Sequence, residues 1–149
     1  MPSASPERST LLHCLLYWEQ RAPQQIYLTQ PYPDGSVQDW TWQQVGDEVR
    51  RIAQYLQSVG LPAHSNIALL GRNSAHWIMA DLAIWMAGHV TVPLYPTLNA
   101  DTAAYVLEHS DAQLLIVGKM DGKADGCNSS KSRTIHEPIP YHEAVGFFI

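Results

Sequence analysis

The sequence predicts an α/β fold in which a hairpin precedes part of a parallel βαβαβ sheet. The short continuous apolar run at 67–70 is typical of a strand that is buried on both faces of a parallel sheet, and the runs at 90–92 and 113–117 are expected to form two further strands. Helical patterns separate these runs, so strand and helix alternate along the chain, as in right-handed βαβ crossovers. Extended runs at 25–29 and 37–40 flank a turn rich in proline, aspartate and glycine, which predicts the hairpin.

An amphipathic first helix is expected to open near 5–7, where a serine and a proline precede a glutamate. Its apolar run at 11–18 is shorter than the roughly 20 residues that span a bilayer. Glu19 and Arg21 stand where the cleavage site of a signal peptide needs small residues. We therefore expect no transmembrane segment and no secretory signal.

The clearest helix of the chain follows the hairpin. Thr41 and Gln44 fit a capping box, in which the hydroxyl accepts from the backbone three residues on and the amide reaches back. Gly60 and Pro62 are expected to end this helix. Charged and amide side chains on one face indicate a solvated surface, and the opposite face is apolar: Val45, Val49, Ile52, Ala53, Leu56 and Val59.

The next helix is expected to begin after Ser74, to run to about Ala87 and to end at Gly88. Apolar side chains surround most of its circumference, which predicts burial on more than one side. Pro93 is expected to stop the strand that follows, and Asn99 to cap a helix over 100–109.

Composition excludes several classes of protein. Hydrophobic residues make up 46% of the 149 residues, which is enough for a core. A net charge of -5 disfavours a nucleic-acid binder and leaves no polybasic membrane patch. Two cysteines, Cys14 and Cys127, cannot form a disulfide framework or a four-thiolate zinc site. We expect a reduced, cytoplasmic protein, and peripheral attachment to a membrane stays open.

The composition changes near the end of the chain. All lysines (Lys119, Lys123 and Lys131) and both phenylalanines (Phe147 and Phe148) lie in the last 31 residues. The segment from 121 to 133 is mostly glycine, aspartate, lysine, asparagine and serine with little periodicity. These features predict one domain portion over 1–122 and a divergent or poorly ordered tail over 123–149.

The candidate phosphate-loop and zinc motifs in the sequence lack the residue spacing that their chemistry requires. The glycine–lysine pair at 122–123 lacks the upstream glycine and the following hydroxyl of a phosphate loop. The His136–Glu137 and His142–Glu143 pairs are six residues apart with two prolines between them, unlike a helical zinc motif. The residues alone therefore predict no catalytic, cofactor-binding or metal-binding residue in this chain.

Several segments together carry a resemblance to a known family, and the most specific is the run VPLYPT at 92–97 with the WMAG before it. The others lie at 40–45, 47–51, 65–77, 80–88, 105–110 and 117–119. Together they resemble the amino-terminal part of the AMP-forming acyl-CoA synthetases, in the long-chain fatty acid ligase branch of the adenylate-forming enzymes. The fold expected from this resemblance is the first part of their large amino-terminal domain.

The resemblance implies a reaction for the full-length family. Such enzymes use Mg-ATP to convert a fatty acid to an acyl-adenylate and then transfer the acyl group to coenzyme A. The family's Ser/Thr/Gly-rich phosphate loop and its catalytic lysines have no counterpart in this sequence, so we carry no family catalytic residue onto any position here. The matching residues Asn73, Trp77, Pro93, Tyr95 and Thr97 are interpreted as packing and turn residues.

Three functional hypotheses follow from these observations. The first is an amino-terminal fragment of a long-chain fatty acid–CoA ligase that is inactive alone, with fatty acid, ATP and coenzyme A as partners of the full-length family. The second is a non-catalytic binding or regulatory module on the same scaffold, which could self-associate through open sheet edges. The third, a small flavodoxin-like nucleotide binder, is disfavoured because no helix start carries the glycines it needs.

Overall fold

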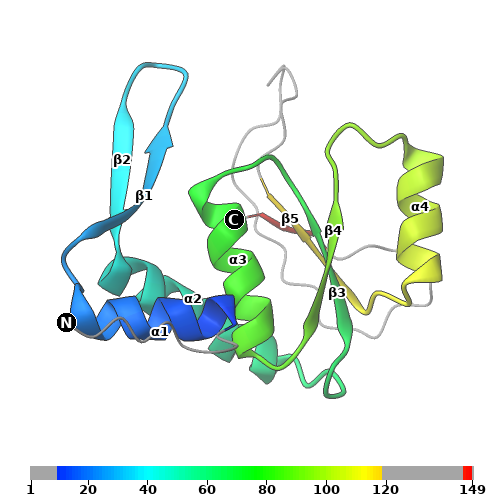
Figure 1. Ribbon diagram of the computed structural model, residues 1–149. Helices are drawn as coiled ribbons and strands as arrows, with labels where there is room; N and C mark the ends of the chain where they lie inside the picture. Colours follow the sequence, from blue (N-terminus) through cyan, green and yellow to red (C-terminus); the bar gives the residue numbers. More distant parts are fainter. Residues whose placement is uncertain (1–9, 119–145, 149) are drawn as a thin grey trace.

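The computed structural model describes residues 10–118 and 146–148 (Figure 1). In chain order the elements are α1 (Leu11–Arg21), β1 (Ile26–Pro31), β2 (Val37–Thr41), α2 (Trp42–Ser58), β3 (Asn66–Leu70), α3 (Ala75–Met86), β4 (Val90–Leu94), α4 (Ala100–His109), β5 (Leu114–Val117) and β6 (Gly146–Phe148).

The strands form two sheets. β1 and β2 pair antiparallel as a hairpin, which extends away from the helices (Figure 1). The second sheet has the order β4-β3-β5-β6, and every neighbouring pair in it is parallel. The predicted α/β class with a hairpin and a parallel βαβαβ unit is therefore confirmed.

Helices lie on both faces of the parallel sheet. α1, α2 and α3 gather on one side of it and α4 lies on the other (Figure 1). One core cluster lies between the sheet and the first set of helices: Leu56, Ile67, Leu69, Ala80, Ile84, Leu114 and Ile116. A second cluster lies among the helices themselves: Leu15, Val45, Val49, Ala53, Ala75, Met79, Leu82 and Ala83. α3 contributes to both clusters, so its predicted burial on more than one side is confirmed.

Two capped helices keep the expected boundaries. In the capping box of α2, the Gln44 backbone N–H donates to Thr41 Oγ1 at 3.2 Å, and the Thr41 N–H donates to Gln44 Oε1 at 2.9 Å. Gly60 follows this helix with a φ of 76°, a left-handed conformation that glycine adopts without a Cβ clash. α4 occupies the expected 100–109 and is capped by Asn99.

Two expectations need correction. α1 begins at Leu11, later than expected, because Thr10 has extended backbone and its side chain accepts from the His13 N–H; residues 5–7 lie outside the described residues. Pro93 does not stop β4 but lies within it, which is possible because β4 is an edge strand. Residues 146–148, which lie in the predicted tail, form β6 beside β5, and the division of the chain at 122 stays a prediction.

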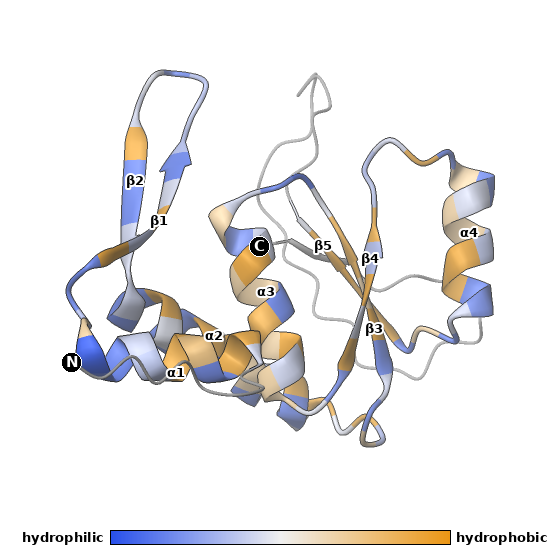
Figure 2. Ribbon diagram, viewed as in Figure 1, coloured by the Kyte–Doolittle hydropathy of each residue, from blue (hydrophilic) through white to orange (hydrophobic). Residues whose placement is uncertain are grey.

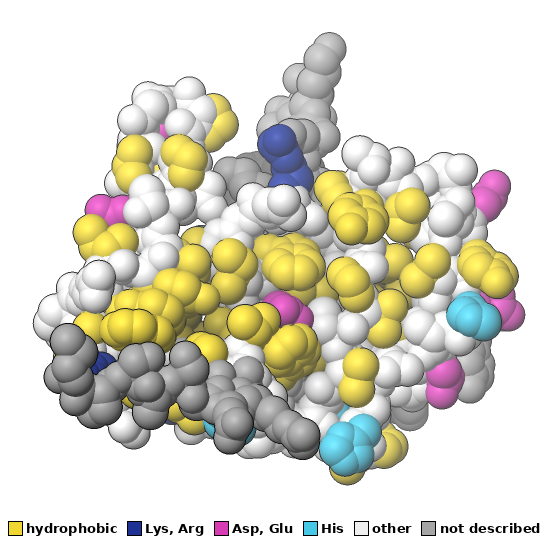
Figure 3. All heavy atoms as spheres, viewed as in Figure 1, with side chains coloured by type: hydrophobic (Ala, Val, Ile, Leu, Met, Phe, Trp, Pro, Cys, Tyr) yellow, Lys and Arg dark blue, Asp and Glu magenta, His cyan; other side chains and the backbone are white. Residues whose placement is uncertain are grey.

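Apolar residues concentrate where the helices meet the sheet. Figure 2 shows hydrophobic residues along α2, α3 and the central strands, whereas the hairpin is largely hydrophilic. The face seen in Figure 3 also exposes hydrophobic side chains over α3 and the strands next to it. The described part of the chain therefore buries a core and still presents apolar surface.

Candidate functional site

The candidate site is the edge of the sheet where the parallel strands end, because ligands of open α/β sheets bind outside the carboxyl ends of the strands. β3, β4 and β5 end at Leu70, Leu94 and Val117. The loops at 71–74 and 95–99 follow the first two of these strands and lead into α3 and α4.

The backbone closes tightly where β3 and β5 end. The Gly118 N–H donates to the Leu70 carbonyl at 2.7 Å. A Cβ added at Gly71 would lie 3.3 Å from Gly118 Cα and 3.5 Å from Trp77 Cδ1. Glycine at position 71 therefore lets the two strand ends and the Trp77 ring pack against one another.

The helix that begins at this edge already has partners for its amino-terminal N–H groups. Ser74 Oγ accepts from the Trp77 N–H at 3.1 Å, and Gln30 Oε1 from the hairpin accepts from the Ala75 N–H at 2.9 Å. At the start of α4, Asn99 Oδ1 accepts from the Thr102 N–H at 2.8 Å. These are the donors that a phosphate group uses at a helix start, and here side chains occupy them.

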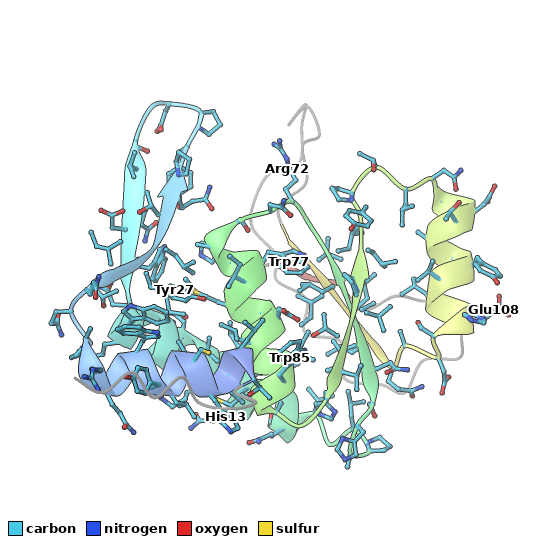
Figure 4. All side chains as sticks on the ribbon, viewed as in Figure 1. His13, Tyr27, Arg72, Trp77, Trp85 and Glu108 are labelled. Atoms are coloured by element: carbon cyan, nitrogen blue, oxygen red, sulfur yellow. The ribbon has the colours of Figure 1, made fainter. Side chains whose placement is uncertain are left out.

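The described side chains at this edge do not fit a magnesium–triphosphate group. Within 10–118 and 146–148, no group of three or more His, Cys, Asp or Glu is placed to hold a metal ion. Arg72 is exposed and extends away from Trp77 (Figure 4). All the lysines, and the two His–Glu pairs, lie outside the described residues. We derive no catalytic step here, and the absence of site residues from the whole chain stays a prediction.

The residues that carried the resemblance have different surroundings. Trp77 is partly buried against the sheet core, as expected of a packing residue. Tyr95 is 72% exposed and its carbonyl accepts from the Leu98 N–H at 3.1 Å, in keeping with a turn residue. Asn73 and Thr97 are exposed in the loops that follow β3 and β4, in keeping with turn positions. The structure thus gathers these residues toward one edge but assembles no reactive group from them.

An ion pair between helices was missed by sequence reasoning. Arg50, expected on a solvated face, donates from Nη1 to Glu19 Oε2 at 2.9 Å and from Nη2 to Asp47 Oδ1 at 2.9 Å. The hydrogen bond to Glu19 and then that to Asp47 raise the pKa of Arg50 above its ordinary value. Because Glu19 lies 31 residues before Arg50, no local spacing could have predicted this link between α1 and α2.

An aromatic cluster joins α1, the hairpin and α2. The Tyr27 and Trp42 rings stack with centroids 3.6 Å apart, and Trp18 lies 6.0 Å from Trp42. Burial, and then the neighbouring Cys14, raise the pKa of Tyr27. Cys14 is partly buried here. The cluster contains no carboxylate or histidine that could make it an acid–base site, and we interpret it as structural packing.

No helix in the described ranges has both the length and the apolar character needed to cross a bilayer.

Comparison with known proteins identifies the family, which the geometry of the site does not. Long chain acyl-CoA synthetase 4 of Arabidopsis thaliana is 35% identical over 77 residues, which are 52% of this chain and 12% of the relative. Long-chain-fatty-acid–CoA ligase FadD15 of Mycobacterium bovis is 29% identical over 101 residues, 68% of this chain and 17% of the relative. The chain therefore spans less than a fifth of either protein.

A solved structure shows the same fold. The fatty acid AMP ligase from Legionella pneumophila superposes with a TM-score of 0.70 at 20% identity, over 78% of this chain and 21% of that protein. Residues 17–145, well over half of the chain, match the family described as AMP-binding enzyme. The parallel sheet with its capped helices is thus part of a larger adenylate-forming fold, and the chain belongs to the AMP-binding enzyme family.

Proposed function

We propose that this chain is the amino-terminal portion of an ATP-dependent, AMP-forming long-chain fatty acid–CoA ligase and that it is catalytically incomplete alone. One observation carries the proposal: the chain matches the AMP-binding family over 17–145 yet spans only 12% and 17% of two relatives named as long-chain acyl-CoA synthetase and ligase. In the proposed full-length enzyme, a fatty acid reacts with ATP to give an acyl-adenylate and pyrophosphate, and coenzyme A then takes the acyl group.

The residues at the carboxyl ends of the parallel strands support the proposal that the chain is catalytically incomplete. Pyrophosphate departure leaves negative charge that an adenylating enzyme stabilises with cations and N–H donors. Here the helix-start N–H groups of Ala75, Trp77 and Thr102 donate to side chains of the chain itself. We also find no match in the sequence to the family's phosphate loop, in which a lysine and a glycine follow the Ser/Thr/Gly-rich residues. We infer that the scaffold is present here and that the groups that hold the triphosphate belong to the rest of the domain.

An ATP–pyrophosphate exchange assay tests this proposal. The purified chain is incubated with a long-chain fatty acid, Mg-ATP and labelled pyrophosphate, beside a full-length long-chain ligase as positive control. We expect no exchange above the rate without protein. Saturable, fatty-acid-dependent exchange by the chain alone would show that its own residues hold ATP, and the proposal would then be wrong.

The non-catalytic module is the second candidate, and the exposed apolar surface over α3 and β4 favours it, because such surfaces receive partners. It predicts a soluble monomer that unfolds cooperatively, whereas an incomplete domain is expected to aggregate. Sedimentation together with thermal unfolding distinguishes them. A monodisperse protein with a single sharp transition favours the module, and aggregation without a transition favours the fragment.

A further inference from the structure

We propose that Asp34 in the hairpin turn is a site of spontaneous isoaspartate formation, and that hydrogen bonds from Ser36 hold down the rate of this reaction in the folded chain. The turn lies at the tip of the hairpin, away from the helices (Figure 1). The reaction needs no enzyme and no reactant other than water. It does not depend on the proposed function, because it involves only the residues of the turn between β1 and β2.

The reaction closes a ring between two neighbouring residues. The Gly35 backbone nitrogen attacks Cγ of Asp34, a new C–N bond forms, and the carboxyl OH leaves with the nitrogen proton as water. Water then adds to one of the two carbonyl carbons of this cyclic imide. Opening at Cγ restores aspartate, whereas opening at the Asp34 backbone carbonyl carbon directs the main chain through the side chain, which gives isoaspartate. One water leaves and one returns, so nothing is oxidised or reduced.

The turn requires the residue type that makes this ring closure easy. Gly35 has a φ of 83°, a left-handed conformation that favours glycine. A side chain on the attacking residue hinders closure, and glycine has none. Beyond the two chain neighbours of Gly35, no atom of the described chain lies within 4 Å of the position that a Cβ would take. Asp34 and Gly35 are both exposed, so water reaches the imide.

Ser36 stabilises the unreactive form of the Asp34 carboxyl group. The Ser36 Oγ–H donates to Asp34 Oδ1 at 2.6 Å, and the Ser36 N–H donates to the same oxygen at 2.9 Å. These bonds, the side-chain bond first, lower the pKa of Asp34, so the carboxylate persists to lower pH. A carboxylate resists attack by the amide nitrogen, because its oxygen cannot leave as water until it is protonated. The two bonds therefore slow the reaction and also fix the orientation of the carboxylate.

The backbone of the turn also opposes ring closure. The Gly35 N–H donates to the Tyr32 carbonyl at 3.0 Å, and the Tyr32 N–H donates to the Ser36 carbonyl at 2.8 Å. The imide nitrogen carries no hydrogen, so ring closure removes the first of these bonds. Isoaspartate also adds one backbone carbon to the turn, next to the paired residues Pro31 and Val37. Because the reaction disrupts these bonds, the folded hairpin resists it.

The sequence supplies comparison sites for this reaction. Aspartate is followed by glycine at 34–35, 121–122 and 125–126, and the last two pairs lie outside the described residues. All these pairs have the same attacking residue, so their rates can be compared in one sample. Serine follows the glycine only after Asp34. A substitution at position 36 should therefore change the rate at Asp34 and leave the rates at the other two pairs unchanged.

Peptide mapping tests the inference. The purified chain is incubated in heavy-oxygen water, with and without urea, and is then digested in ordinary water. Mass spectrometry measures isoaspartate and label at each Asp–Gly pair, because each passage through the imide adds one heavy oxygen. We expect Asp34 to react in both samples and faster in urea. Ser36→Ala should raise the rate at Asp34 without urea by about threefold to tenfold and leave the rate in urea unchanged.

Matched variants decide the outcome. Ser36→Thr keeps the hydroxyl and should react near the wild-type rate. Circular dichroism checks that both variants fold, which is expected because position 36 is exposed. No isoaspartate or label at Asp34, or equal wild-type rates with and without urea, would overturn the inference. So would equal rates for Ser36→Ala and wild type without urea, or the same increase for Ser36→Ala in urea. None of these results alters the exchange assay, so the proposed function stands or fails separately.

Discussion

At the scale of single residues, the lack of a side chain at Gly46 leaves room for the ion pair between Glu19 and Arg50. Gly46 is buried in α2, and a Cβ there would collide with the carboxylate of Glu19, the group that pairs with Arg50. We expect Gly46→Ala to destabilise the chain by about 1–2 kcal/mol, because Glu19 must move and leave Arg50. Chemical denaturation measures the change.

The control for this prediction is the same substitution in a Glu19→Ala background. Without the carboxylate, the added methyl meets no obstacle, and alanine is favoured over glycine inside a helix by about 1 kcal/mol. Gly46→Ala should then be neutral or stabilising. An equal cost in both backgrounds would show that the collision with Glu19 is not the cause.

Asp34 in the hairpin turn gives a pH-dependent prediction. The Ser36 Oγ–H and N–H donate to Asp34 Oδ1 at 2.6 and 2.9 Å, and these bonds lower the pKa of Asp34, the side-chain bond first. Because this pKa is lowered, ionised Asp34 stabilises the turn at pH values above the ordinary aspartate pKa. That stabilisation is lost as the pH falls through the pKa that Asp34 has in the folded protein.

NMR titration of the Asp34 carboxyl carbon measures this effect. We expect a midpoint below the ordinary aspartate value and an upward shift of the midpoint in Ser36→Ala, because one of the two donors is lost. Asp39, whose carboxylate accepts from Thr29 rather than from Ser36, serves as the internal control. An unchanged Asp34 midpoint in Ser36→Ala would contradict the assigned cause.

At the scale of elements, α2 depends on the cap that joins it directly to β2. Thr41 is the last residue of β2 and the cap of α2, so its side chain holds a chain reversal as well as a helix end. Thr41→Ala should cost about 1 kcal/mol of unfolding free energy, since the Gln44 N–H loses its acceptor. Thr41→Ser keeps the hydroxyl and should recover most of that loss in the same denaturation experiment.

At the scale of the whole molecule, stability is distributed unevenly between the two faces of the sheet. α3 contributes Ala75, Met79, Ala80, Leu82, Ala83 and Ile84 to the buried set, whereas α4 has no buried residue. We expect the amides of α4 to exchange with deuterium through local opening, well before those of α3. Mass spectrometry after hydrogen exchange tests this, and equal protection of α3 and α4 would contradict it.

The sequence predicted the features that depend on neighbouring residues and did not predict those that depend on distant ones. Periodicity and caps predicted α2, α3 and α4, because Thr41, Ser74 and Asn99 act on donors within a few residues of themselves. The resemblance carried by the segments from 40 to 119 predicted the family. Pro93 was misread as a strand stop, because only the strand order shows that its missing N–H faces outward.

The sequence by itself determined the order of helices and strands, the α/β class and membership of the AMP-binding family, since each depends on local pattern or on motif identity. Tertiary structure alone decided that Glu19 pairs with Arg50, that Gln30 occupies the start of α3, and that β4 is an edge strand among the strands the structure describes. These features join residues far apart in the chain, and no local spacing encodes which distant groups the folded backbone brings together.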